Sequence, residues 1–133
     1  MNIIDRLRDD YQRFPKDQSY DLYADGVYFK DPLNEFRGVD RYRTMIGTLD
    51  LWLKDIHLDL HRIEATAPQH LETHWTLSWR APLPWQPTMS IPGWSELKLD
   101  DTGKICSHVD YWHCSRWEVL QQLIPGVQIR QNK

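Results

Sequence analysis

The sequence of this 133-residue protein has few cysteines and no long apolar segment. Cys106 and Cys114 are its only cysteines, and two thiols without a disulfide framework are typical of a reducing compartment. No stretch approaches the ~18 apolar residues that a membrane-spanning helix needs. The N-terminal segment MNIIDRLRDDYQRF has charges where a secretory signal needs an unbroken apolar run. We therefore expect a cytoplasmic protein with free thiols and no membrane insertion.

The sequence also lacks an excess of positive charge and several cofactor motifs. Its 16 Lys and Arg residues are outnumbered by 19 Asp and Glu residues, and both signs are spread along the chain. Such a chain has no basic field to attract nucleic acid or anionic lipid. A glycine-rich phosphate loop, a Ser-His-Asp order and a CxxC pair are all missing. We therefore expect no nucleic-acid partner and no cofactor.

Aromatic residues, in contrast, are abundant. The chain has seven Trp, six Tyr and three Phe, while its hydrophobic fraction of 41% is ordinary for a folded protein. Aromatic side chains bury large areas, and Trp and Tyr keep a polar group. Their number suits either a stiff core or a lined cavity, and the chain length fits a single domain over residues 1–133.

Apolar spacing predicts three helices in the first half of the chain. Residues 3 to 14 repeat apolar side chains at helical spacing until Pro15 ends the pattern. After Asp17, a candidate N-cap, the segment QSYDLYADG predicts a short second helix that ends before Gly26. Residues 39 to 53 repeat apolar side chains at every third or fourth position and predict a third helix.

The second half of the chain has the alternation of β-strands. From Ile56 the apolar residues recur at every second position, and similar patterns predict strands over residues 71–80, 88–99 and 104–112. SRWEVLQQLIPG then opens with a capping box, and Pro125-Gly126 should end this last helix. The predicted fold is α+β, with three N-terminal helices on one face of a strongly curved antiparallel sheet and a short C-terminal helix.

Two stretches, DLYADGVYFKDPLNEFRGVDRYRTMIG and GKICSHVDYW, resemble the nuclear transport factor 2-like superfamily, which includes SnoaL-like and ketosteroid isomerase-like proteins. This resemblance implies a cone-shaped, cystatin-like fold with a pocket between sheet and helices. The superfamily contains isomerases, polyketide cyclases, epoxide hydrolases and proteins without catalysis. TLSWRAPLPWQP and DYWHCSR are similar to an uncharacterised family from cyanobacteria and plant plastids. A fold shared by so many activities does not assign one.

The face that the last strand turns toward the pocket depends on its register. A two-residue turn would pair Ser95 with His108, and a three-residue turn would pair Glu96 with His108. The apolar pattern of the preceding strand favours the register that turns His108, Asp110 and Trp112 inward. The resemblance favours the same choice, because the cyclases and epoxide hydrolases have a cavity-facing aspartate at the place of Asp110. In the alternative, Ile105 and its odd-numbered neighbours form the core, and His108 and Asp110 face solvent.

Candidate catalytic residues are Asp31, His108, Asp110 and Tyr11. The resemblance to isomerases makes Asp31 a candidate general base, whereas an Asp before a proline also commonly caps a turn. His108 and Asp110 lie two apart on one strand face and can share a proton or orient a water. By the same resemblance, Ser95 lies near the place of an oxyanion donor and Tyr11 near that of a helix-one tyrosine.

A metal site is not expected from this sequence. His108, Asp110, His113 and Cys114 are near neighbours, but strand alternation sends His113 to the opposite face from the first two.

Trp75, Trp79 and Trp112, with Phe29 below them and Ser95 beside them, would line an aromatic funnel suited to a small apolar ligand. The alternative is that these rings only fill the core. We therefore rank three hypotheses. The first is a domain that binds a small hydrophobic molecule, and the second is an acid-base enzyme of isomerase, cyclase or dehydratase type that uses Asp31 or Asp110 with His108 or Tyr11. The third is an interaction module whose sheet forms a homodimer or docks another protein.

Overall fold

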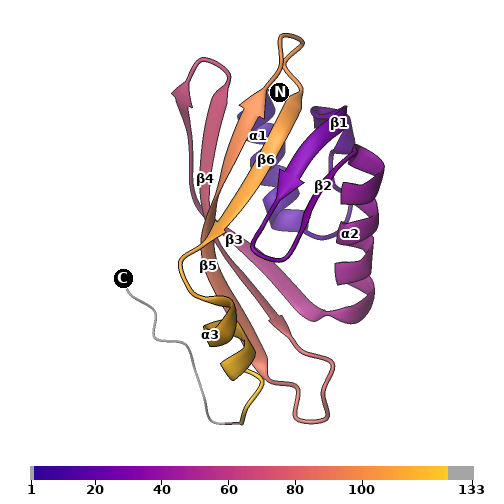
Figure 1. Ribbon diagram of the computed structural model, residues 1–133, viewed down its shortest axis with the longest axis vertical. Coiled ribbons are helices and arrows are strands. Elements are labelled where there is room, and N and C mark those ends of the chain that lie inside the picture. Colours follow the sequence, from indigo (N-terminus) through magenta and orange to yellow (C-terminus); the bar gives the residue numbers. More distant parts are fainter. Residues whose placement is uncertain (1, 126–133) are drawn as a thin grey trace.

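A strongly bent sheet and three α-helices make up residues 2–125, the part of the chain that the computed structural model describes (Figure 1). Gly126, which the sequence predicts to end the last helix, lies outside these residues. The strands are β1 (Tyr23–Lys30), β2 (Glu35–Arg37), β3 (Lys54–Ala67), β4 (His70–Arg80), β5 (Thr88–Leu99) and β6 (Ile105–Trp112), and the helices are α1 (Ile3–Arg13), α2 (Val39–Trp52) and α3 (Arg116–Gln121). None of the described helices is long and apolar enough to cross a membrane.

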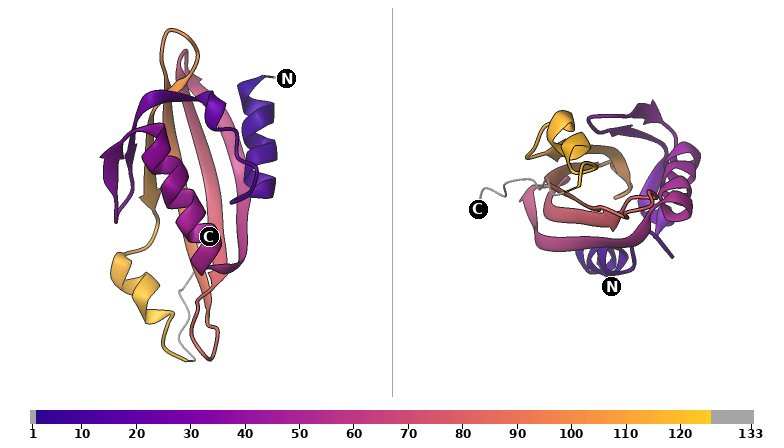
Figure 2. Two further views of the ribbon diagram at one scale, coloured as in Figure 1. Left: turned by 90° about the vertical axis from the view of Figure 1, so that its right-hand side faces the viewer. Right: turned by 90° about the horizontal axis from the view of Figure 1, so that it is seen from below.

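The strands lie in the order β2-β1-β6-β5-β4-β3, and the predicted antiparallel meander of β3 to β6 is confirmed. The expectation of a purely antiparallel sheet is wrong, because β1 pairs with β6 in parallel. Three register irregularities in β3 bend the sheet, since an extra residue in one strand increases the local bend and twist. Seen from below, the sheet curls round and α2 lies across its open side (Figure 2).

Two of the three predicted N-terminal helices form as expected, and the middle one does not. Residues 20–22 form a single 3₁₀ turn, and β1 begins at Tyr23. In β1 the buried side chains are Tyr23, Val27 and Phe29, so strand alternation and pairing with β6 override the helical spacing of this segment. Asp17, expected to cap a helix, instead adopts a positive φ of 50°.

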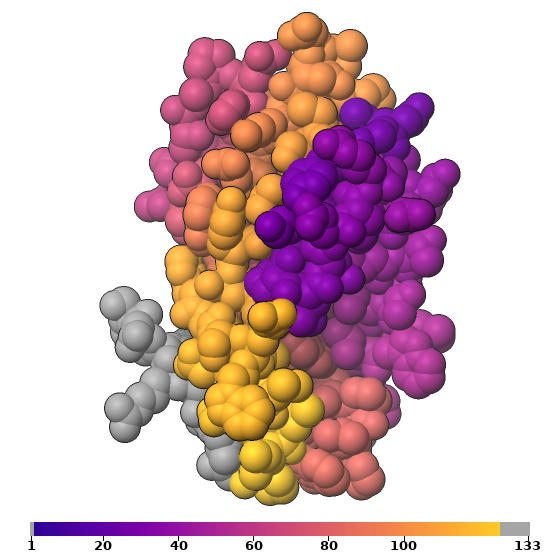
Figure 3. Space-filling model, viewed as in Figure 1, coloured from indigo at the N-terminus to yellow at the C-terminus, as the bar shows by residue number. Residues whose placement is uncertain are grey.

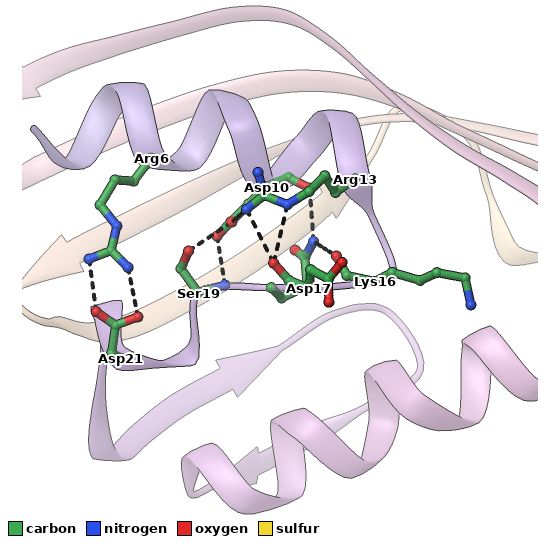
Figure 4. A network of polar contacts seen from close by, with 8 residues as sticks. Arg6, Asp10, Arg13, Lys16, Asp17, Ser19 and Asp21 are labelled. Carbon is green, nitrogen blue, oxygen red and sulfur yellow. Dashed lines mark hydrogen bonds and ion pairs between the residues drawn. The ribbon is translucent and has the colours of Figure 1, made fainter. Parts of the chain in front are cut away.

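A buried carboxylate fixes the segment between α1 and β1. Asp10 is 4% exposed and accepts hydrogen bonds from the backbone N–H and the hydroxyl of Ser19, at 3.0 and 2.9 Å. Arg13 forms an ion pair with the same carboxylate at 2.8 Å (Figure 4). The Ser19 backbone N–H is therefore held by a side chain and not by a helical turn, which is consistent with the missing helix.

The β5–β6 register is neither of the two predicted pairings. A three-residue turn between Asp100 and Lys104 pairs Leu99 with Ile105, and Gly103 takes the positive φ of 84° that this turn requires. One extra residue then follows in β6, so that Leu97 pairs with His108. Because of this bulge, Ile105 and His108 are both buried although they are three residues apart.

Helix α3 covers one end of the molecule. At one end α3 lies beside the β4–β5 loop (Figure 3), where Trp85 donates its indole N–H to the carbonyl of Leu123 at 2.9 Å. The capping box predicted for α3 is confirmed, since the Ser115 hydroxyl accepts from the Glu118 backbone and the Glu118 carboxylate accepts from the Ser115 backbone. Val119 of α3 thereby packs toward Trp75, Met89 and Ile91.

We predict that Gly93→Ala destabilises the fold, because Gly93 is where the Trp75 ring crosses β5. A Cβ at this position would lie 2.6 Å from Cη2 of Trp75 and 2.6 Å from the carbonyl oxygen of Tyr111. Urea denaturation should show a loss of about 1–3 kcal/mol in the free energy of unfolding. Gly47→Ala in α2 is the control, because nothing lies within 4 Å of its Cβ and alanine favours a helix. Equal stability of Gly93→Ala and the wild type would contradict this packing.

Candidate functional site

A cavity of about 320 Å³ lies between the concave face of the sheet and helices α1 and α2. Most of its walls are apolar or aromatic, and β4, β5 and β6 each contribute side chains from alternate positions. The structure places all nine sequence-predicted site residues in this lining, while their roles remain predictions. They are Tyr11, Phe29, Asp31, Trp75, Trp79, Ser95, His108, Asp110 and Trp112.

One polar cluster interrupts the apolar wall and joins three strands. Ser95 of β5 is 1% exposed, and its hydroxyl donates to Oδ1 of Asp110 on β6 at 2.5 Å. The same hydroxyl oxygen accepts from the indole N–H of Trp75 on β4 at 2.8 Å. His108 Nε2 lies 2.7 Å from Oδ1 of Asp110 and donates to it. Asp110 is thus fixed through one carboxylate oxygen by a hydroxyl and an imidazole.

Two tyrosines continue this cluster on the far side of His108. The Tyr23 hydroxyl lies 3.2 Å from Nδ1 of His108, and the Tyr42 hydroxyl lies 3.4 Å from that of Tyr23. Burial is the largest cause that raises the pKa of both tyrosines, so both are neutral hydroxyls near pH 7. The Tyr23 hydroxyl donates its one proton to the Tyr42 oxygen, so the Tyr23 oxygen can accept from Nδ1 of His108 when that nitrogen carries a proton, while Nε2 donates to Asp110.

Asp31 caps a turn and also lies in the wall of the cavity. Its Oδ1 accepts from the backbone N–H groups of Leu33 and Asn34 at 2.7 and 2.6 Å, so it caps the turn after β1. It also lines the cavity. Burial is the main cause that raises the pKa of Asp31, hydrogen bonds from Leu33 and Asn34 oppose the rise, and the charge of Asp110 adds to it. The negative charge of Asp110 therefore acts on the carboxyl group of Asp31.

Tyr11 reaches the cavity from α1. Its hydroxyl lies 2.8 Å from Oγ1 of Thr73, a fully buried residue of β4, and burial raises the pKa of Tyr11. Neither Thr73 nor the tyrosines beside His108 were recognised as site residues from the sequence. Thr73 lies on the same face of its strand as Leu71 and Trp75, so strand alternation could have identified it. Tyr23 was assigned to a helix that does not form.

The neighbouring histidine and cysteine take no part in the cluster. His113 is exposed beyond the end of β6, and Cys114 is half-buried near α3, where burial raises its thiol pKa. Across residues 2–125, no group of three or more His, Cys, Asp or Glu side chains is placed to hold a metal ion.

With this geometry in view, comparison with known proteins gives the family. A family model described as "Uncharacterized conserved protein (DUF2358)" matches residues 1–108. The chain belongs to this family. No curated protein matches it. The expectation of an uncharacterised family is thus confirmed, and its relation to cyanobacteria and plastids stays a prediction.

Solved structures show that this DUF2358 member has the NTF2-like fold predicted from its sequence. An NTF2-like protein from Burkholderia thailandensis has a TM-score of 0.76 at 13% identity, over 92% of this chain and 95% of that chain. A protein with a ketosteroid isomerase-like fold from Catenulispora acidiphila has a TM-score of 0.73 at 16% identity, over 91% of each chain. An LEH-like epoxide hydrolase from M. tuberculosis has a TM-score of 0.69 at 16% identity, over 90% of this chain and 85% of that chain. At these identities the likeness concerns the fold alone.

Ser95→Ala tests the polar cluster. The change leaves the buried indole N–H of Trp75 without an acceptor and removes one donor from Asp110, so urea denaturation should show a loss of about 1–3 kcal/mol. Near-ultraviolet circular dichroism should change as well, since the Trp75 ring loses its anchor. Ser107→Ala on the outer face of β6 is the matched control and should change stability by less than about 0.5 kcal/mol. A Ser95→Ala protein as stable as this control would refute the proposed bridge.

Proposed function

We propose that this DUF2358 domain binds a small, mainly apolar organic molecule in the cavity between its sheet and helices. The observation that carries the proposal is the combination of a cavity of about 320 Å³, walls that are largely aromatic and aliphatic, and one fixed carboxylate. Binding sites for small molecules typically have volumes of about 300–1,000 Å³, with apolar walls and a few polar groups that orient the ligand.

Asp110 is the polar group best placed to orient a ligand. Ser95 and His108 both donate to its Oδ1, and no other described residue donates to its Oδ2. The side chain is 19% exposed, which leaves that oxygen accessible from the cavity. A ligand with one hydrogen-bond donor can therefore bind Oδ2 while its apolar part contacts the rings of Trp79 and Trp112.

The similar structures support a ligand-binding role in general terms. The protein from Catenulispora acidiphila is in complex with trimethylamine, and the M. tuberculosis protein is an epoxide hydrolase. Both are statements about those proteins, and they are consistent with a small-molecule site in a chain of this fold.

An acid-base enzyme is the second candidate, and one observation favours it. Asp31 and Asp110 both line the cavity, and burial raises the pKa of Asp31, as a general base working near neutral pH needs. The turn-capping bonds to Asp31 oppose this role, because they stabilise its ionised form and occupy its Oδ1. Ligand binding therefore remains the first candidate.

The predicted homodimer through the sheet stays a prediction. On the outer face, the rings of His74, Trp94 and Tyr111 form a stack with centroid separations of 6.2 and 4.4 Å across β4, β5 and β6. Tyr111 is exposed and the other two rings are half-buried, so this stack is a candidate surface for such a dimer.

Native mass spectrometry of the protein purified from its own cells tests the proposal. We expect wild-type protein to retain a small molecule that organic solvent releases. Leu49→Trp should abolish this retention, because Leu49 lines the cavity and an indole there would occupy ligand space. Leu51→Trp is the control, since Leu51 lies on the same helix and is 78% exposed. Retention of the same molecule by both variants would contradict binding in the cavity.

A further inference from the structure

We infer that the ligand of this cavity is an organic cation, an amine or a quaternary ammonium, held by Asp31, Asp110 and the tryptophan rings. This inference rests on the proposed function and specifies the chemical class of its ligand. It comes from the charges of the lining residues, which are all of one sign apart from His108.

The described residues that line the cavity include no lysine and no arginine. Their carboxylates are Asp10, Asp31 and Asp110. Asp10 is already paired with Arg13 at 2.8 Å, so its charge is balanced by the protein itself. Burial keeps the tyrosines of the lining neutral. The charge available to a ligand is therefore that of Asp31, Asp110 and His108.

Neither state of His108 makes this set neutral. With a protonated His108, the imidazolium balances Asp110 and leaves the charge of Asp31. With a neutral His108, both carboxylates remain unbalanced. Asp31 has only neutral partners, the backbone of Leu33 and the backbone and side chain of Asn34. The guanidinium of Arg116 donates to the carbonyl oxygen of Pro32 at 3.4 Å and not to the Asp31 carboxylate, and Arg116 itself is exposed to solvent.

A carboxylate that loses hydration without a cationic partner is disfavoured in its charged form. Asp31 shows this effect, because burial raises its pKa and the charge of Asp110 raises it further. A cationic ligand would offset the lost hydration of both carboxylates. An anionic ligand would meet repulsion from the same groups, and the lining offers no guanidinium or ammonium to receive it.

The aromatic walls suit the same class of ligand. The faces of tryptophan rings attract organic cations, and the attraction grows where water is excluded. Trp75 is 6% exposed and its indole N–H is bound to Ser95, which fixes the orientation of its ring beside Asp110. Trp79 and Trp112 also line the cavity. Carboxylates and fixed rings together form a site for the alkylated nitrogen of an amine.

The test is a comparison of three probes of similar size on the full chain. Benzyltrimethylammonium is the cation, 2,2-dimethylpropylbenzene is its neutral carbon isostere, and phenylacetate is the anion. Affinities are measured by displacement of a fluorescent apolar reporter dye from the cavity. We expect the cation to bind at least about tenfold more tightly than the isostere, and phenylacetate to bind most weakly.

Variants of the two carboxylates test which residues cause the preference for the cation over its neutral isostere. Asp31→Asn and Asp110→Asn should each lower the cation-to-isostere affinity ratio several-fold. Asp25→Asn makes the same change in net charge at an exposed position of β1 and should leave the ratio unchanged. Circular dichroism spectra identical to that of the wild type establish that each variant is folded, and the wild-type comparison does not depend on any variant.

Each result supports or overturns a separate claim. If the isostere binds as tightly as the cation, the charge inference is wrong and the proposed apolar site stands. If the cation is preferred and neither Asp31→Asn nor Asp110→Asn changes the ratio, the assignment to these carboxylates is wrong. If no probe displaces the dye and the cavity-filling Leu49→Trp variant binds the dye as well as the wild type, the proposed function itself fails.

Discussion

The hydroxyl of Ser95 is the contact on which the site depends. It links β4, β5 and β6 on the concave face, because it accepts from Trp75 and donates to Asp110. A serine with 1% exposure in a sheet interior needs both partners, since a buried hydroxyl without hydrogen bonds costs about 1–3 kcal/mol. Any register in which Asp110 faced outward would leave the buried Ser95 O–H without its acceptor. The polar cluster thus stabilises the same strand register that creates the cavity.

The polar cluster around Asp110 fixes the orientation of the side chains in the site more than it contributes to the free energy of unfolding. Replacing a hydrogen-bonded buried carboxylate by a well-packed apolar residue is often neutral or stabilising, so stability alone does not explain Asp110 at this position. Asp110, His108 and Tyr23 form a connected set in which each member fixes the orientation of the next. Such preorganisation is what a binding site requires, because the polar groups need no rearrangement when a ligand arrives. Asp31 adds a second carboxylate to the same cavity while it caps the turn after β1.

Much of the fold follows from local patterns in the sequence, and the exceptions have non-local causes. Residues 39–53 and the strand beginning at 88 are predictable from apolar spacing alone, and the parity of Asp110 follows from the apolar side of β5. The helix expected before Gly26 does not form, because pairing of Tyr23 and Tyr28 with the distant β6 outweighs a local helical stripe. The sequence does not reveal the extra residue in β6, so the exact partner of His108 was missed, although its inward direction was predicted.

Local patterns also explain which residues of the site could be predicted from the sequence. Strand alternation identifies Trp75, Ser95 and His108, since side-chain direction in a strand follows from position. It does not identify Tyr23 or Tyr42, whose place beside His108 depends on how β1 and α2 pack against β6. The NTF2-like fold brings these separate segments together around one cavity.

Nitrogen-15 NMR of the histidine side chains tests the central claim most directly. If His108 donates to an inward-facing Asp110, its Nε2 carries the ring proton and exchanges that proton slowly with water, in contrast to the ring N–H of the exposed His113. Asp110→Ala should abolish the slow exchange and leave the signal of His113 unchanged. A neutral His108 that carries its proton on Nδ1 and not on Nε2, or an Nε2 proton that exchanges as fast as that of His113, would contradict the buried carboxylate–imidazole pair and the site built on it.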